Sequence, residues 1–280
     1  MSESQKLKDK VMVITGGGGV LCSAMAREAA RQGASVAILD LKFENAQSVA
    51  HSIMDEGGQA MAVECNVLEM ESIRKAGDRV MEAFGSCDIL VNGAGGNHPK
   101  GTTSKTHFEI NDEEREEVTS FFDLDPEGIS FVFNLNFIGT LLPTQVFARQ
   151  MIGRDGCSVI NISSMNAFRP LTKIPAYSGA KAAISNFTQW LAVHFAKSNI
   201  RVNAMAPGFF LTDQNRSLLT DENGDLTARG NTIIDHTPMG RFGTPEDLLG
   251  TLTWLCSNDA SFVTGVVIPI DGGFSAFSGV

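Results

Sequence analysis

Short runs of apolar residues alternate along the chain with longer stretches in which apolar residues recur at helical spacing. The short runs predict buried strands at residues 11–14, 35–40, 60–64, 88–92, 158–162, 201–206 and 266–270. The longer stretches predict helices at residues 23–32, 45–56, 69–84, 139–151, 177–198 and 245–256. Strands that alternate with helices are typical of a parallel sheet covered by helices. Because no repeat or low-complexity linker interrupts the pattern, we expect residues 1–280 to form one α/β domain.

The alternation is broken once, between Asn92 and Asn136, which are separated by 43 residues. This interval contains the acidic run 109–117, which we interpret as a solvated surface helix or loop. The alternative is a lid over a substrate, because long loops at strand ends often carry sites. We therefore expect a substrate-loop insertion at roughly residues 97–130.

Composition and charge narrow the class of protein. Hydrophobic residues make up 43% and charged residues 19% of the chain, as in an ordinary globular protein. The formal net charge of −10 argues against nucleic acid or an anionic membrane as a main partner. Five scattered cysteines and five histidines show no metal-ligand spacing, so we expect no metal site and a reducing compartment. The N-terminal segment has no apolar signal core, and no apolar run approaches the length of a membrane span, so we expect a cytoplasmic location.

A glycine run follows the first predicted strand and opens a helix. In Thr15-Gly16-Gly17-Gly18-Gly19, glycines let the backbone approach a pyrophosphate, which a helix N-terminus then stabilises. Asp40 ends the second predicted strand 24 residues after Gly16, where a carboxylate can accept hydrogen bonds from both ribose hydroxyls of an adenosine. The same charge repels a 2′-phosphate, although Lys42 could partly offset it, so the expected cofactor is NAD rather than NADP. Both features also have a purely structural explanation: the glycines could form only a tight turn, and Asp40 could only cap the start of a loop.

A possible proton-transfer pair lies in the second half of the chain. Tyr177 and Lys181 are four residues apart, so on a helix they share one face, and Ser164 lies thirteen residues before the tyrosine. A phenol with a pKa of about 10 is a poor acid or base at neutral pH. A neighbouring ammonium favours the phenolate and is expected to lower that pKa. The hydroxyl of Ser164 could hold a substrate oxygen against the phenol.

Taken together, the motifs resemble the short-chain dehydrogenase/reductase family over almost the whole chain. The resemblance rests on the glycine turn, a central Asn-Gly-Ala-Gly, and the separated polar residues, that is on Thr15-Gly16, Asn92 to Gly95, Asn136, Ser164, Tyr177, Lys181, Pro207-Gly208 and Thr212. It implies a single-domain Rossmann fold, a doubly wound seven-stranded parallel sheet with helices on both faces. It also implies a homotetramer.

The family roles carry over by position. Tyr177 would donate or accept the substrate proton, and Ser164 would hold the substrate oxygen. Lys181 would lower the phenol pKa and bond the nicotinamide ribose, and Asn136 would anchor a water. The implied NAD-binding residues are Thr15, Gly16, Gly17, Gly18, Gly19, Val20, Leu21, Asp40, Asn66, Val67, Asn92, Gly93, Ala94, Gly95, Tyr177, Lys181, Pro207, Gly208 and Thr212. The segment from Asn92 to Gly95 would line the adenosine ribose, and Thr212 with the Pro207-Gly208 turn would hold the carboxamide.

The chain departs from the family pattern in two places. Val20 and Cys22 stand where glycines are usual, and Cys22 is expected to crowd the helix start. Asn66 stands where an aspartate commonly bonds the adenine amine, and its amide oxygen can still accept that hydrogen bond.

The loops that would surround the nicotinamide are polar, which points to a polar substrate. Amides and imidazoles suit the hydroxyls of a polyol, and cationic side chains suit a carboxylate. The expected substrate-binding residues are Asn97, His98, Ser164, Asn166, Arg169, Lys173 and Gln214, and Arg216 is a further cation in the same loops.

The segments 97–100, 163–177 and 271–280 also resemble one subgroup of the family, the D-mannonate oxidoreductases or fructuronate reductases. That resemblance implies the reduction of D-fructuronate by NADH to D-mannonate. The alternatives are gluconate 5-dehydrogenase, another polyol dehydrogenase or a 3-oxoacyl reductase. A non-catalytic dinucleotide sensor is a further alternative, which would need only the first half of the chain.

Overall fold

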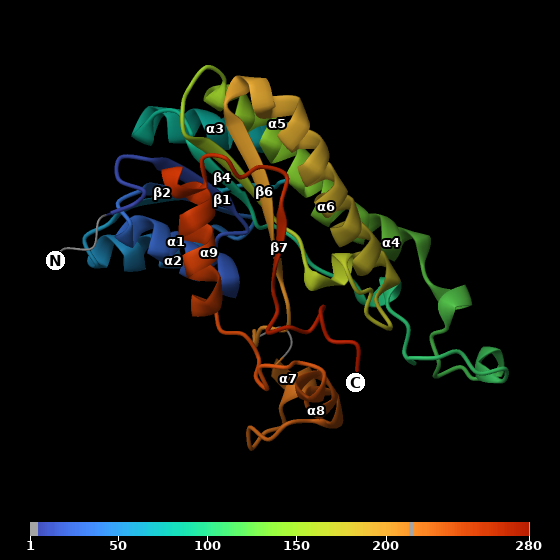
Figure 1. Ribbon diagram of the computed structural model, residues 1–280. Coiled ribbons are helices and arrows are strands. Elements are labelled where there is room, and N and C mark those ends of the chain that lie inside the picture. The colour runs from blue at the N-terminus through green and yellow to red at the C-terminus, as the bar shows by residue number, and fades with distance from the viewer. Residues whose placement is uncertain (1–4, 213–215, 280) are drawn as a thin grey trace.

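The computed structural model describes residues 5–212 and 216–279, which form one parallel sheet with helices on both faces (Figure 1). The strands are β1 (Val11–Thr15), β2 (Ser35–Asp40), β3 (Gln59–Glu64), β4 (Ile89–Asn92), β5 (Cys157–Ile162), β6 (Ile200–Pro207) and β7 (Val267–Ile270). Their order is β3-β2-β1-β4-β5-β6-β7, and every neighbouring pair is parallel. The order reverses between β1 and β4, the point at which open parallel sheets bind ligands. The predicted doubly wound, seven-stranded Rossmann fold is confirmed.

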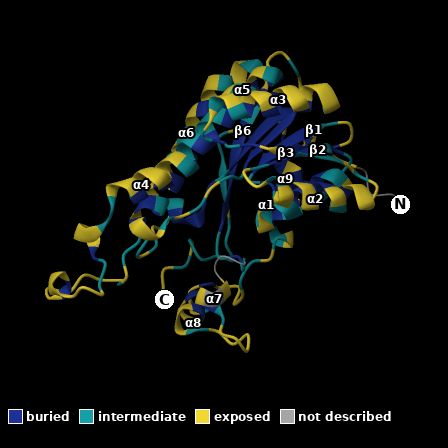
Figure 2. Ribbon diagram, turned by 180° about the vertical axis from the view of Figure 1, so that it is seen from behind, coloured by how far each residue is buried: buried dark blue, intermediate teal, exposed yellow. Residues whose placement is uncertain are grey.

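Two layers of helices cover the sheet. Helices α1 (Val20–Arg31), α2 (Phe43–Asp55) and α9 (Glu246–Cys256) pack on one face, and α3 (Met70–Phe84), α5 (Gly139–Met151) and α6 (Pro175–Phe195) pack on the other. Successive side chains of β1 point to opposite faces of the sheet. Met12 belongs to the core cluster that includes α1, and Val13 belongs to the one that includes α5. In Figure 2 the strands are buried between helices whose outer surfaces are exposed.

A helix that the apolar pattern did not predict precedes α5. Helix α4 (Pro126–Phe133) begins within the predicted insertion of residues 97–130. The Asp125 side chain accepts a hydrogen bond from the Glu127 N–H, and Pro126 has the fixed φ of a first helical residue. The chain continues through one π-helical segment, Asn134–Ile138, into α5. Such segments frequently occur at functional sites, and this one contains Asn136.

By length and mean hydropathy alone, the continuous segment Pro126–Met151 is the one helix of the described chain that could cross a membrane. In the fold it packs against α3 and α6, and 44% of its apolar window is buried. Its buried polar residues bond within the domain; the Thr144 hydroxyl, for example, accepts a hydrogen bond from Asn92. Helices of a protein core meet the same criteria, and the packing identifies this segment as one of them.

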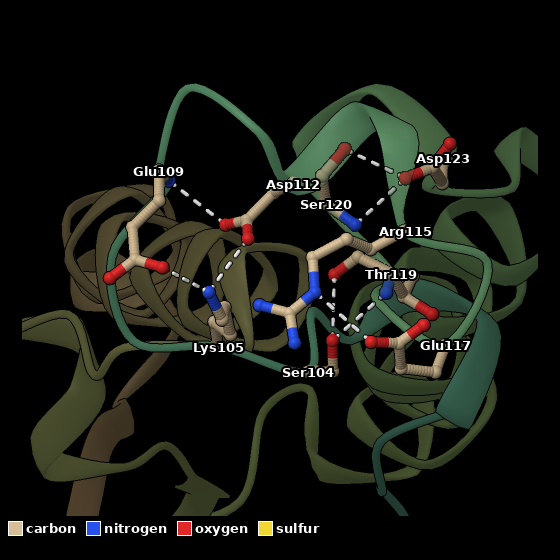
Figure 3. Close-up of polar contacts among 9 residues, drawn as sticks. All are labelled: Ser104, Lys105, Glu109, Asp112, Arg115, Glu117, Thr119, Ser120 and Asp123. Carbon is tan, nitrogen blue, oxygen red and sulfur yellow. Dashed lines mark hydrogen bonds and ion pairs between the residues drawn. The ribbon is translucent and has the colours of Figure 1, made fainter.

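Residues 99–125, which we call the arm, project past α4 away from the sheet (Figure 1). The arm contains three 3₁₀ turns, Pro99–Gly101, Asp112–Glu114 and Phe121–Asp123. Internal polar contacts hold it together, among them those from Lys105 to Asp112 and Glu109 (Figure 3). The acidic run 109–117 is exposed except at Asp112, as expected for a solvated surface segment. The lid function of the insertion stays a prediction.

In the described residues between β6 and α9, the structure has two short helices. They are α7 (Arg216–Leu219) and α8 (Ala228–Asp235), neither of which the apolar pattern predicted. Figure 1 shows the C-terminus close to both of them, beyond the carboxyl end of β7.

Candidate active site at the carboxyl ends of the strands

The glycine run between β1 and α1 forms a turn in which an added side chain would clash at three positions, Gly16, Gly17 and Gly18. Gly16 has a φ of +61°, and an added Cβ would lie 2.9 Å from the Ala94 Cα. An added Cβ on Gly18 would lie 2.5 Å from the Asn45 Cβ. Helix α1 then begins with Gly19 as its N-cap, and no side chain caps it. The N–H groups of the first turn therefore lack a side-chain acceptor, which fits a pyrophosphate bound there.

The departure at Cys22 is accommodated by the residue opposite it. Cys22 is buried, and a Cβ added to Gly93 would lie 2.3 Å from its sulfur atom. The thiol therefore packs against the backbone of Gly93 instead of displacing the helix start, and α1 begins at Val20, three residues earlier than predicted. Burial raises the pKa of Cys22 to about 12, so the thiol is neutral and adds no negative charge beside the phosphate site.

Asp40 links the end of β2 to the glycine turn. Its Oδ2 accepts a hydrogen bond from the Gly18 N–H at 3.0 Å, and its Oδ1 accepts one from the Lys42 N–H at 3.0 Å. The carboxylate thus caps the loop and also places a negative charge beside the glycine cradle, and its contact with ribose stays a prediction. Each carboxylate oxygen retains a lone pair for a ribose hydroxyl. These residues fit NAD, and the charge disfavours a 2′-phosphate.

The structure brings the four predicted catalytic residues together from three elements. Ser164 follows β5 and opens a 3₁₀ turn, while Tyr177 and Lys181 lie on the first turns of α6. Ser164 shares a hydrogen bond with the Tyr177 hydroxyl. The Lys181 ammonium lies 5.5 Å from the Tyr177 ring centroid and donates to the Ile162 carbonyl at 2.8 Å. This geometry places a phenol, a hydroxyl and an ammonium at the end of β5.

Asn136 connects this group to the turn after β4. Its Nδ2 donates to the carbonyls of Gly96 at 2.7 Å and Val132 at 2.8 Å, and its Oδ1 accepts from the Gly96 N–H. Gly95 fits closely between the two sides, because an added Cβ would lie 2.7 Å from Asn136 Oδ1 and 3.2 Å from Lys181 Nζ. The π-helical segment therefore holds the turn after β4 against Lys181.

The expectation that Lys181 lowers the pKa of Tyr177 is wrong for the protein alone. Burial raises the pKa of Tyr177 to about 12, and the hydrogen bond with Ser164 lowers it by less. Burial also lowers the pKa of Lys181 to about 8. Desolvation disfavours the charged form of each group, and here it outweighs the attraction that a charged lysine would exert on a phenolate. The lysine also donates to the Ile162 carbonyl, and its ammonium lies over the Tyr177 ring, 5.5 Å from the ring centroid.

The adenosine side differs from the prediction at Asn92. Its side chain is buried and donates to Thr144 Oγ1 on α5 and to Asn161 Oδ1 on β5, both at 2.9 Å. The Asn92 side chain therefore belongs to a buried polar network, which corrects its expected contact with ribose. The neighbouring backbone is held at the surface of the site instead, because Thr15 Oγ1 accepts hydrogen bonds from the N–H groups of Gly93 and Ala94.

Asn66 forms the turn that starts α3. Its Oδ1 accepts from the Leu68 N–H at 3.0 Å and its Nδ2 donates to Glu69 at 2.8 Å. A second lone pair on Oδ1 leaves the proposed adenine contact open. Val67 beside it is buried, and Leu21 packs partly buried against the core.

The expected carboxamide segment follows β6. Gly208 donates its N–H to the Ile270 carbonyl at 2.9 Å, directly after Pro207 ends the strand. The Thr212 carbonyl accepts from the Arg216 N–H at the start of α7. Gln214 lies outside the described residues.

The predicted substrate residues fall in two groups. Asn97 and His98 cap the turn at the base of the arm, where Asn97 donates to Thr102 and His98 accepts from the Lys100 N–H. Asn166, Arg169 and Lys173 lie in the segment 165–174 between Ser164 and α6, which we call the substrate loop. The amide oxygen of Asn166 is buried and has no hydrogen-bond partner among the described residues.

The substrate loop is held from both sides by contacts that the sequence did not suggest. The Arg169 Nε donates to the Ser275 carbonyl at 3.1 Å. Lys173 has a φ of +73°, rare for a residue with a side chain, and its carbonyl accepts from the Thr103 N–H at 2.8 Å. Backbone atoms of Thr103 and Ser275 carry no sequence signal, so residue types alone could not have identified these contacts.

Comparison with known proteins identifies similar chains along the whole length. The family model described as enoyl-(acyl carrier protein) reductase matches residues 20–275. A Bacillus subtilis protein named uncharacterized oxidoreductase UxuB is 52% identical over 277 residues, which cover 99% of this chain and 98% of the relative. A Haemophilus influenzae crystal structure with bound NAD, provisionally named D-mannonate oxidoreductase, is 57% identical, covers 98% of each chain and has a TM-score of 0.94. A Burkholderia cenocepacia gluconate 5-dehydrogenase in complex with NADP and tartrate is 28% identical, covers 98% of each chain and has a TM-score of 0.84.

Proposed function

The chain belongs to the short-chain dehydrogenase/reductase family and is an NAD-dependent oxidoreductase, and we propose that it interconverts a keto sugar acid and its hydroxy acid. The pair that the site supports best is D-fructuronate and D-mannonate. The observation that carries this choice is the substrate loop, which presents the exposed guanidinium of Arg169 and the ammonium of Lys173 between Ser164 and Tyr177. The name of the NAD-bound relative supports the same substrate.

The cofactor supplies the hydride when NADH is bound, and the protein residues handle the proton. Because the pKa of Tyr177 is about 12, the phenol is protonated at neutral pH and can act as the acid of a reduction. The Ser164 hydroxyl would hold the substrate carbonyl oxygen, which takes the proton from Tyr177 as its carbon takes the hydride. Lys181, with a pKa of about 8, is mostly cationic at neutral pH and would stabilise the phenolate that remains. Asn136 would hold the water through which this proton is replaced.

A carboxylate on the substrate would account for the cationic side chains of the substrate loop, Arg169 and Lys173. Four of the seven expected substrate residues are amides or an imidazole, which pair with hydroxyls, whereas the Arg169 guanidinium pairs with a carboxylate. A 3-oxoacyl chain on an acidic carrier protein fits this surface poorly, because the net charge of −10 would repel the carrier. A dinucleotide sensor would have no use for the Ser164, Tyr177 and Lys181 group.

Gluconate 5-dehydrogenase is the second candidate. The relative of that name binds tartrate, a hydroxy acid, and shares the fold of this chain. Both candidates need the same proton transfer and a carboxylate site, so only substrate comparison separates them.

The assay is NADH oxidation with D-fructuronate, 5-ketogluconate and D-tagaturonate side by side. We expect D-fructuronate to have the highest kcat/KM. Replacing Tyr177 by Phe should lower kcat by at least about 100-fold while NADH binding survives, because only the transferable proton is lost. Undiminished turnover by Tyr177→Phe would exclude the proposed chemistry, and a higher kcat/KM for 5-ketogluconate would favour the second candidate.

Two further proposals concern the setting of the enzyme. All five cysteines are free and buried, which supports a reducing, cytoplasmic location. The outer face of α6 exposes Trp190 and Val193, at 58% and 81%, and supports assembly of copies of this chain into a homotetramer. Light scattering on the protein and on Trp190→Glu tests the assembly, and an unchanged mass for the variant would exclude this face.

A further inference from the structure

The C-terminal tail, residues 271–279, lies against both walls of the proposed substrate site. On one side the Gly272 carbonyl accepts from the Met239 N–H at 3.1 Å, and the Phe274 ring packs edge-on against Phe209 at 5.2 Å between centroids. On the other side the Ser275 carbonyl accepts from Arg169 Nε in the substrate loop. The tail therefore connects the segment after β6 to the loop that would bind the substrate carboxylate.

Asp271 fixes the conformation of this tail. Its Oδ1 accepts from the Gly273 N–H at 3.0 Å and its Oδ2 accepts from the Ser275 N–H at 2.9 Å. The backbone of Asp271 is itself held closely, because a Cβ added to Gly208 would lie 2.6 Å from the Asp271 Cα. The carboxylate thus sets where the Ser275 peptide lies, and the Ser275 carbonyl sets where the Arg169 guanidinium lies.

The guanidinium that results is oriented and still open to a ligand. Only Nε of Arg169 is engaged, and its terminal nitrogens contact no acceptor within residues 5–212 and 216–279. The planar guanidinium presents its N–H groups as a rigid fork, so fixing Nε fixes the direction of the remaining donors. An exposed arginine ordered before binding loses less side-chain freedom when a carboxylate arrives.

We propose that Asp271 and Ser275 are positioning residues that hold Arg169 ready for the carboxylate of the substrate. The inference rests on the proposed function, because it assumes that the substrate carries that carboxylate. Neither residue touches substrate or cofactor in this account, and both act through Arg169.

The experiment compares D-fructuronate with D-fructose, a neutral keto sugar on the same carbon chain, in four variants. Asp271→Ala should raise KM for D-fructuronate about tenfold, leave kcat within about twofold and leave KM for D-fructose unchanged, since only carboxylate binding depends on a pre-ordered Arg169. Arg169→Ala should raise the same KM further. In the double variant, Asp271→Ala should add nothing to the effect of Arg169→Ala, because a positioning residue has no role without its target. Ser278→Ala, an exposed change in the same tail, is the matched control and should behave as wild type.

The outcomes separate the two proposals. If Arg169→Ala leaves KM for D-fructuronate unchanged, the carboxylate substrate itself is wrong. If Arg169→Ala raises that KM but Asp271→Ala does not, or if the two effects multiply in the double variant, the positioning role is wrong. Equal KM changes for both sugars would also overturn it. Should Asp271→Ala fail to fold, Asp271→Asn retains one acceptor oxygen and the side-chain volume, and the same comparison applies with a smaller expected shift.

Discussion

Burial of Lys181 should make the free energy of unfolding depend on pH, and the direction of that dependence identifies a buried lysine. Lys181 is 4% exposed, and desolvation lowers its pKa from 10.5 to about 8. Between about pH 8 and pH 10.5, the Lys181 side chain is mostly protonated in the unfolded chain and mostly neutral in the folded chain. Protonation therefore favours unfolding in this window, and the contribution of Lys181 to stability rises as the pH increases from about 7 toward 10.5.

The two pKa values give the size of the effect. Between about pH 7 and about pH 9.5, the free energy of unfolding should rise by about 2 kcal/mol through Lys181 alone. Lys181→Met keeps the length of the side chain without the charge, so it lacks this contribution. The other titrating groups are common to both proteins and cancel when the two are compared.

Urea unfolding of wild type and Lys181→Met at the two pH values measures the difference, with tryptophan fluorescence as the signal. We expect wild type to gain about 2 kcal/mol relative to the variant at the higher pH. An unchanged difference between the two proteins would mean that Lys181 keeps its ordinary pKa. The reasoning about its burial would then be refuted.

Substitutions at three other positions test separate parts of the site. Asp40→Ala removes the charge beside the glycine turn, so KM for NADH should rise about tenfold and the preference over NADPH should shrink; a retained preference in coenzyme kinetics would contradict its role. Lys173→Gly and Lys173→Ala both remove the ammonium, but only glycine relieves the left-handed backbone, so thermal unfolding should show the glycine variant more stable by roughly 1 kcal/mol. Equal stability of the two would show that this backbone carries no strain. Gly95→Ala places a Cβ 2.7 Å from Asn136 Oδ1 and should lower kcat about 100-fold, whereas Gly250→Ala, with open space around its Cβ, should have wild-type kcat.

The sheet could be predicted from the sequence because its strands are buried on both faces. A strand such as β2, Ser35–Asp40, reads as a continuous apolar run, and its predicted bounds match the structure. The proximity of the candidate catalytic residues was predictable for a related reason: Tyr177 and Lys181 keep helical spacing, and Ser164 follows an apolar strand. The carboxyl ends of parallel strands then bring such residues to one edge.

Features without a period or a residue-type signal could not be predicted. The π-helical segment around Asn136 adds one residue to a helical turn and leaves no mark in the apolar pattern. The link between Arg169 and Ser275 uses a carbonyl that every residue possesses. The raised pKa of Tyr177 depends on desolvation, which requires the packed structure, whereas the sequence showed only the neighbouring lysine.

The central claim is that this oxidoreductase recognises a keto sugar by its carboxylate. The most direct measurement is the ratio of kcat/KM for D-fructuronate to kcat/KM for D-fructose, with NADH, in wild type and in Arg169→Ala. A carboxylate bound by a guanidinium predicts a wild-type ratio of at least about 100 that falls about tenfold or more in the variant. A wild-type ratio near one, or a high ratio that Arg169→Ala leaves intact, would contradict the account.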